Sequence, residues 1–126
     1  MRNFGLTALG LSIALTFAAT SAMAAGDAEK GEKVFKKCKV CHTVEKGGAN
    51  KTGPNLFGIV GRKSATVDGY HYSKAMEGMN IVWDDEKLDI YLTKPRAYVK
   101  GTKMSFPGLK KESQRQDLIA YLNTLH

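Results

Sequence analysis

Residues 38–42 of the sequence read Cys38-Lys39-Val40-Cys41-His42. The two cysteines are three positions apart, so a single helical turn brings both thiols to the same side of the chain. They are the only cysteines among 126 residues, and the histidine directly follows the second one. This pentapeptide therefore limits the kinds of site, and with them the kinds of fold, that the chain can form.

Four kinds of site use a Cys-x-x-Cys pair. A zinc site needs a second pair of ligands, and the remaining histidines, His71 and His126, do not form one. A thioredoxin-like redox pair belongs in a βαβ context that the sequence lacks. A structural disulfide is the ordinary expectation for paired cysteines in an exported chain. The adjacent His42 favours the fourth kind, attachment of haem c, in which two thiols form thioethers with one porphyrin and the imidazole ligates iron.

The first 25 residues predict a secretory signal peptide. Met1–Asn3 carries one positive charge, residues 4–19 are almost entirely apolar or small, and Ala22-Met23-Ala24 fits a cleavage site. A membrane anchor is the alternative, but the apolar run is shorter than the ~20 residues that a spanning helix needs. We therefore expect residues 1–25 to be removed and residues 26–126 to form one soluble domain in the periplasm.

The charge of the chain restricts its partners. The formal net charge is +7, and removal of Arg2, the only charged residue before Gly26, leaves +6. A strongly positive surface attracts acidic partners and raises association rates. Nucleic acid is disfavoured because the protein is exported and its lysines are not interleaved with stacking aromatic residues. We expect a monomer that binds acidic proteins and meets membranes only through those partners.

Residues 26–126 predict an all-α domain with about three main helices. Asp27 and Asp84 are suited to cap the first two helices. In the last helix, Leu118, Tyr121 and Leu122 recur at the spacing of one helical face. The glycine-rich stretch 47–61 predicts a loop. The helices are expected at 27–37, from 84 toward Pro95 and from 111 or 112 to 125, with short helices at 73–78 and 96–100.

Three helices joined by long loops make a small core, because a domain of ~100 residues buries only a modest fraction of its surface. A large, flat, apolar cofactor would fill its centre. A second iron ligand opposite the histidine could come from Met76, Met79 or Met104. Methionine at helical spacing is usually core filler. Met104 instead lies in a loop between Gly101 and Gly108, and the residues alone leave this choice open.

The sequence resembles class I cytochromes c, especially the soluble bacterial cytochromes c2 and their mitochondrial relatives, over essentially all of residues 26–126. The motifs that carry the resemblance, in order, are Cys38-Lys39-Val40-Cys41-His42, Lys51-Thr52-Gly53-Pro54-Asn55-Leu56, Gly101-Thr102-Lys103-Met104 and Asp117-Leu118-Ile119-Ala120-Tyr121-Leu122.

This resemblance implies the class I cytochrome c fold around one haem c, attached through Cys38 and Cys41 and ligated by His42 and Met104. It also implies an electron carrier, and no enzyme, that serves photosynthesis or respiration. The implied donor is a cytochrome bc complex, and the implied acceptor is a photosynthetic reaction centre or a terminal cytochrome oxidase.

The resemblance also implies roles for residues around the cofactor. The carbonyl of Pro54 would accept a hydrogen bond from His42. Tyr72 and Trp83 would hydrogen-bond a haem propionate, and Arg62 would offset its charge. Tyr91 and Thr102 would support Met104.

The sequence departs from the family pattern at two positions. Met76 stands where relatives often carry an asparagine in a polar network near the haem, and Asn50 stands where mitochondrial members often carry a buried histidine. The departure at Met76 puts that polar network in doubt here.

Lysines cluster beside the segments that would surround the haem edge, and we predict that they form a docking face. They are Lys36, Lys37, Lys39, Lys51, Lys103, Lys110 and Lys111. A merely solvated surface is the alternative. The competing function is a haem enzyme or gas-binding protein with an open iron position, but gas-binding bundles usually carry the attachment motif near the C-terminus rather than the N-terminus.

Overall fold

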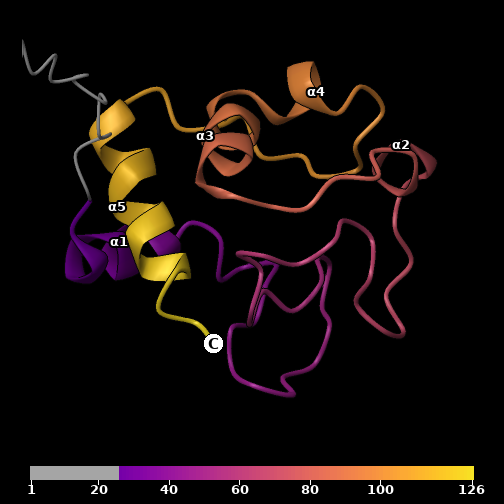
Figure 1. The fold of residues 1–126 in the computed structure, drawn as a ribbon, viewed down its shortest axis with the longest axis horizontal. Helices are drawn as coiled ribbons and strands as arrows, with labels where there is room; N and C mark the ends of the chain where they lie inside the picture. The colour runs from indigo at the N-terminus through magenta and orange to yellow at the C-terminus, as the bar shows by residue number, and fades with distance from the viewer. Residues whose placement is uncertain (1–25) are drawn as a thin grey trace, which may run out of the picture.

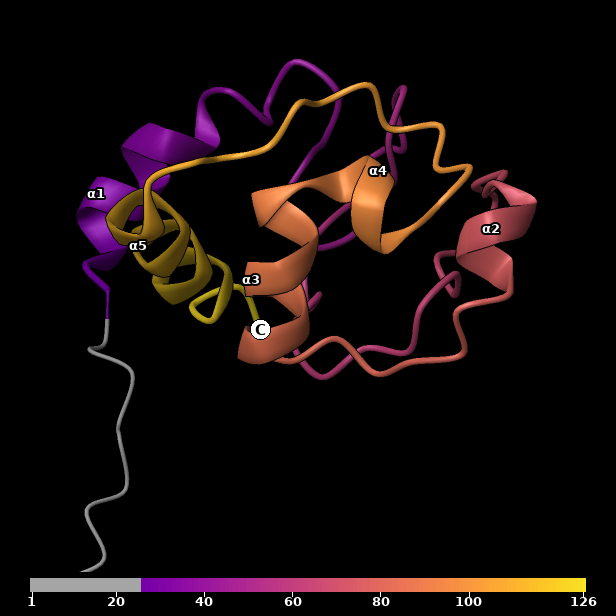
Figure 2. The same ribbon diagram turned by 90° about the horizontal axis from the view of Figure 1, so that it is seen from above.

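The computed structural model describes residues 26–126, so the predicted signal peptide lies outside the described residues. The helices, in chain order, are α1 (Ala28–Phe35), α2 (Lys74–Glu77), α3 (Asp85–Thr93), α4 (Pro95–Tyr98) and α5 (Glu112–Leu122). Helices α1 and α5 lie against each other at one end of the molecule, and α2 lies at the opposite end (Figures 1 and 2). The predicted all-α class is confirmed, with α1, α3 and α5 as the main helices.

Polar side chains begin the helices where the sequence predicts. The Asp27 carboxylate accepts from the amide of Lys30 at 3.1 Å, and Asp84 accepts from the amide of Lys87 at 2.8 Å. Each bond satisfies an amide that the first helical turn leaves free. Pro95 starts α4 instead of only ending α3, because its fixed φ suits the first helical position.

Helices α1 and α5 end two or three residues earlier than predicted. After Phe35 the chain tightens into turns, in which the amide of Lys37 donates to Val34 at 3.1 Å. Helix α5 ends at Leu122, where the backbone amide of Asn123 donates to the carbonyl of Ile119 in the last turn. No helix in the described part of the chain is long and apolar enough to cross a membrane.

The crossing of α1 and α5 depends on a glycine. A Cβ on Gly31 would overlap the carbonyl oxygen of Asp117 and the Cβ of Tyr121, so only glycine allows the two backbones to come this close. Next to it, the rings of Phe35 and Tyr121 lie 5.5 Å apart, and Leu118 is fully buried. This close approach fixes the position of α5 relative to α1.

A short ladder organises the chain before α3. The amide of Gly61 donates to Trp83 at 2.7 Å, and the amide of Trp83 donates to Arg62 at 2.9 Å. Beside this ladder, Ala65 and Asn80 have positive φ values of 57° and 49°, which turn the chain out into a loop that carries α2 and back again. The ladder thus holds the Trp83 side chain in the core, where it is 5% exposed.

Replacing Gly31 by alanine tests the close helix crossing. In an unconstrained helix this change stabilises by ~0.5–1 kcal/mol. Here the added methyl group meets the backbone of α5, so we expect the free energy of unfolding to fall by about 1–3 kcal/mol, measured by denaturant unfolding. Gly78→Ala is the control, because the nearest atoms to its Cβ are at ordinary distances of 3.4 and 3.7 Å. Equal stability of the two variants would contradict the close crossing.

Candidate functional site

A mostly apolar cavity of about 400 Å³ lies at the centre of the described domain. All three main helices contribute to its wall, with Phe35 from α1, Leu88 from α3 and Leu118 from α5. The remaining wall comes from loop residues between positions 37 and 73, from Met76 of α2, from Trp83 and from residues 102–106. The helices therefore surround a central space suited to an apolar group.

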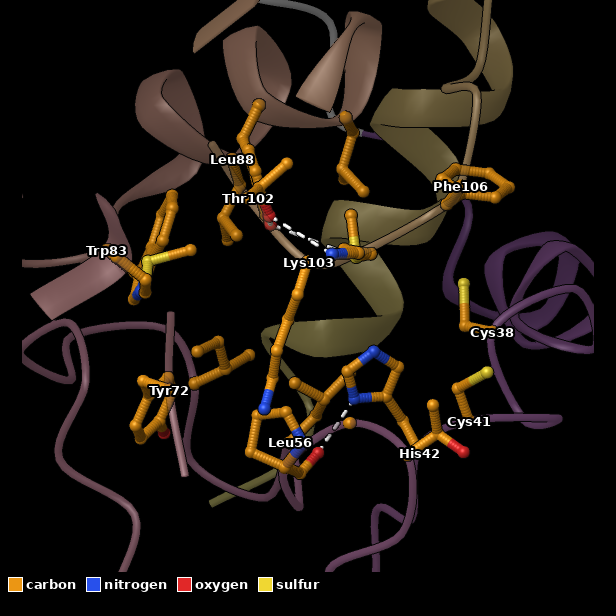
Figure 3. A pocket seen from close by; sticks show the side chains of 18 of the residues that line it. Cys38, Cys41, His42, Leu56, Tyr72, Trp83, Leu88, Thr102, Lys103 and Phe106 are labelled. Atoms are coloured by element: carbon orange, nitrogen blue, oxygen red, sulfur yellow. Dashed lines mark hydrogen bonds between the residues drawn. The ribbon is translucent and has the colours of Figure 1, made fainter. Parts of the chain in front are cut away.

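The cysteine pair lies on the cavity wall directly after α1. The amides of Cys41 and His42 both donate to the carbonyl of Cys38 at 3.0 Å, which closes one tight turn. Figure 3 shows the three side chains together at one side of the cavity. Both cysteines carry free thiols, and burial raises the pKa of Cys38 to about 11. Within residues 26–126, no cluster of three or more acidic, histidine or cysteine side chains is arranged to hold a metal ion.

The backbone of residues 53 and 54 fixes the His42 ring. Its Nδ1 lies 2.7 Å from the carbonyl oxygen of Pro54 (Figure 3). Because a carbonyl only accepts, Nδ1 carries the proton and Nε2 keeps its lone pair. Burial lowers the pKa of His42, which favours the neutral imidazole that a metal requires. A Cβ on Gly53 would overlap the ring, so glycine is needed for this approach.

Met104 reaches the same cavity from the loop between α4 and α5. Its amide donates to the Thr102 hydroxyl at 3.2 Å. The Tyr91 hydroxyl lies 3.4 Å from the Thr102 hydroxyl and donates to the Met104 sulfur at 3.8 Å. Burial raises the pKa of Tyr91, so this phenol stays protonated and can donate. The structure thus brings Tyr91 and Thr102 to Met104, as the sequence analysis predicts.

Arg62, Tyr72 and Trp83 also line the cavity. Arg62 donates to the carbonyl oxygens of Phe57 at 3.0 Å and Asn55 at 3.1 Å, and burial lowers its pKa. The Tyr72 hydroxyl accepts from the amide of Val67 at 3.1 Å. All three side chains thus reach the cavity wall, and their roles toward a propionate stay predictions.

The predicted docking lysines are all exposed. Lys37 and Lys103 reach the cavity wall. The Lys103 ammonium lies 4.4 Å from the centre of the Tyr70 ring and donates to the carbonyl of His71, so it joins two loops across the cavity edge. Lys51 donates to the carbonyl of Lys39 at 2.9 Å. It therefore lies beside the turn of residues 38–42, here called the attachment turn.

Sequence reasoning missed three groups at this site. Lys63 and Phe106 line the cavity, and Asn55, which is 7% exposed, connects the loops beneath His42. The Asn55 amide group donates to the Thr43 hydroxyl at 2.7 Å and to the carbonyl of Glu45 at 2.9 Å. Phe106 had a signal in the sequence, since it is the only aromatic residue between Gly101 and Gly108.

Comparison with known proteins finds a family model and relatives that match the described domain. A family model described as cytochrome c matches residues 28–126. A cytochrome c of Theileria annulata is 58% identical over 98 residues, which cover 77% of this chain and 84% of the relative. A cytochrome c of Guizotia abyssinica is 56% identical over 99 residues, with coverage of 78% and 89%. The corresponding protein of Ginkgo biloba is 52% identical over 98 residues, with coverage of 77% and 87%.

Proposed function

This chain belongs to the cytochrome c family, and we propose that it is an exported cytochrome c2-type carrier that takes electrons from a cytochrome bc complex. It would deliver them to a photosynthetic reaction centre or a terminal cytochrome oxidase. As a member of its family it carries a covalently attached haem c and transfers electrons without being an enzyme. One observation carries the proposal: Cys38, Cys41, His42 and Met104 line a single cavity.

The residues in the cavity fit haem c. Two free thiols three positions apart suit thioether attachment, and His42 presents a free Nε2 because Pro54 occupies Nδ1. Met104 supplies a thioether, which is a soft ligand. The apolar wall suits the porphyrin, and Arg62 supplies a positive charge for its carboxylates.

When bound, the haem supplies an iron that alternates between the ferric and ferrous states. His42 and Met104 would both hold this iron, which would leave it no position for a substrate and restrict it to electron transfer. Thioether ligation favours ferrous iron, and burial disfavours the additional positive charge of ferric iron. We therefore propose a carrier of comparatively high reduction potential.

The chain's own hydrogen bonds keep the two proposed ligands in place. Pro54 fixes the tautomer and direction of the His42 ring. Tyr91 donates to the Met104 sulfur while Thr102 holds the Met104 amide. The Met104 sulfur has two lone pairs, so it can accept the hydrogen bond from Tyr91 with one and still offer the other to iron. This arrangement supports one coordination geometry in both oxidation states.

The exposed lysines beside the cavity support a docking face for acidic partners. Lys37, Lys63 and Lys103 reach the cavity wall, and Lys36, Lys39 and Lys51 adjoin the attachment turn. Long-range attraction would accelerate encounter with a partner, whereas a small interface would allow rapid release. The protein would act as a monomer and reach the membrane only through its partners.

The packing of Gly26 and Asp27 limits where the proposed processing can occur. A Cβ on Gly26 would overlap the backbone of α5 at Gln116, and the amide of Asp27 donates to the Asp117 carboxylate at 2.8 Å. Both residues are therefore part of the folded domain, and processing must leave them in place.

Met104→Ala tests the proposed ligand. We expect loss of the sulfur-to-iron absorption band and binding of carbon monoxide by the ferrous protein. The reduction potential should fall by ~100 mV or more, within the ~0.8 V that axial ligands span. Met79→Ala is the matched control, because Met79 packs against the core but does not line the cavity. An unchanged band in Met104→Ala would exclude Met104 as the ligand.

The docking face predicts a salt-dependent reaction. The rate of electron transfer to an acidic partner should fall about tenfold or more from low to high ionic strength, because screening weakens attraction. Lys37→Gln and Lys74→Gln each remove one positive charge. Lys37 lies just after α1, whereas Lys74 lies on α2 at the opposite end of the molecule. We therefore expect Lys37→Gln to slow the reaction more at low salt. Stopped-flow kinetics measure both effects. Equal slowing by the two variants would contradict a localised docking face.

Export predicts a defined N-terminus. The mass of the haem protein from the periplasmic fraction should equal that of a chain beginning at Ala25 or Gly26 plus one haem. A chain that retained residues 1–25, or one that began after Asp27, would disprove the proposed processing.

A further inference from the structure

Arg115 of α5 is a charged side chain in the core, where the residue is 8% exposed. Its Nε donates to the Asp89 carboxylate of α3 at 2.7 Å. Its Nη1 donates to the carbonyl oxygens of Leu109 at 2.9 Å and Lys110 at 3.0 Å. A buried guanidinium is costly unless it is both paired and hydrogen-bonded, and Arg115 meets both conditions.

The two carbonyl groups belong to the segment that ends the Met104 loop. The amide of Leu109 donates to the carbonyl of Leu92 in α3 at 2.7 Å, and the Leu109 side chain is 3% exposed. A Cβ on Gly108 would overlap the carbonyl oxygen of Thr93, so the backbone lies directly on the end of α3. Residues 108–110 are thus held between α3 on one side and Arg115 on the other.

Between its two attachments the loop is held by side chains, such as that of Lys103, and not by its own backbone. Its first attachment is the bond from the amide of Thr102 to Val99, at 3.0 Å. From there to Leu109, no backbone–backbone hydrogen bond forms in the described structure. The Met104 amide bonds only to a side chain, that of Thr102. The position of Met104 therefore depends on these side-chain contacts and on how firmly the two ends of the loop are held.

We propose that Arg115, held in place by Asp89, is a positioning residue for Met104. By fixing residues 109 and 110 it stabilises the arrangement in which the Met104 sulfur meets the iron and disfavours the open arrangement in which the loop moves away. This inference rests on the proposed function, because it requires Met104 to be the iron ligand.

Imidazole in solution reports the open arrangement directly. It can bind the ferric iron only where Met104 has left, so its apparent dissociation constant equals the intrinsic constant divided by the open fraction. A weaker attachment raises the open fraction and tightens apparent binding by the same factor. The measurement therefore isolates the position of the ligand from the stability of the whole domain.

Two variants weaken the attachment to different degrees. Arg115→Lys keeps the positive charge but cannot reach the carboxylate and both carbonyls together, and Asp89→Asn removes the ion pair while the guanidinium keeps its carbonyl contacts. Asn123→Ala is the matched control. Asn123 also joins α5 to α3, through a 2.8 Å bond to Asp85, but does not touch residues 108–110.

The experiment is an imidazole titration of the four ferric holo-proteins, together with the sulfur-to-iron band, the reduction potential and the unfolding midpoint. We expect imidazole to bind Arg115→Lys about tenfold tighter or more, the factor given by the loss of one charge-assisted hydrogen bond. Asp89→Asn should show a smaller change in the same direction. Both should have a lower reduction potential, and Asn123→Ala should match the wild type in affinity and potential even if its unfolding midpoint falls.

Two results would overturn the inference. One is wild-type imidazole affinity in both Arg115→Lys and Asp89→Asn. The other is tighter binding in all three variants in proportion to their loss of stability, which would show a general loosening of α3 against α5. If Arg115→Lys does not fold, the imidazole affinities of Asp89→Asn and Asn123→Ala are compared instead, and equal affinities overturn the inference. A wild-type protein without the sulfur-to-iron band would instead refute Met104 ligation, and with it both proposals.

Discussion

The contact between the His42 ring and the backbone of residues 53 and 54 is the constraint on which the site depends. Covalent attachment can fix a cofactor only as firmly as the protein fixes the attachment turn. That turn extends from α1, which the Gly31 approach locks against α5. From the opposite side, Gly53 and Pro54 set the plane and tautomer of the imidazole. The His42 ring is thereby oriented by two glycines that allow close packing and by one carbonyl that accepts a hydrogen bond.

The two proposed ligands are held in different ways. His42 lies in a tight turn between the two cysteines and a hydrogen-bonded loop that Asn55 connects to Thr43. Met104 lies in an extended loop that is attached at its ends and by side chains in between. Local unfolding begins where backbone hydrogen bonds are fewest. The Met104 side is therefore the side on which this site can open, and the contacts of Tyr91, Thr102 and Arg115 act against that opening.

Features that depend on neighbours in sequence could be predicted, and those that depend on distant contacts could not. Asp27 and Asp84 signal helix starts because a cap acts within three residues. The early end of α1 gave no signal, because lysines at positions 36 and 37 are good helix formers. The attachment pentapeptide and the Met104 loop were visible as motifs. Arg115 was not, since its partner Asp89 is 26 positions away and its other partners are carbonyl groups, which every residue has.

The interior of the cavity and the surface at its edge differ in charge. The cavity wall is mostly apolar, and the neutral imidazole of His42 and the thioether of Met104 add no charge to it, so a cofactor held there would be favoured in its less charged state. At the cavity edge, Lys37, Lys63 and Lys103 place positive charge where a partner must approach. Those charges remain in water, so they add attraction at long range at little desolvation cost. Lys103 belongs to the Met104 loop and also donates to the carbonyl of His71, so a change at Lys103 would alter both the surface charge and the contacts of that loop, whereas Lys37 has no such second role in the described structure.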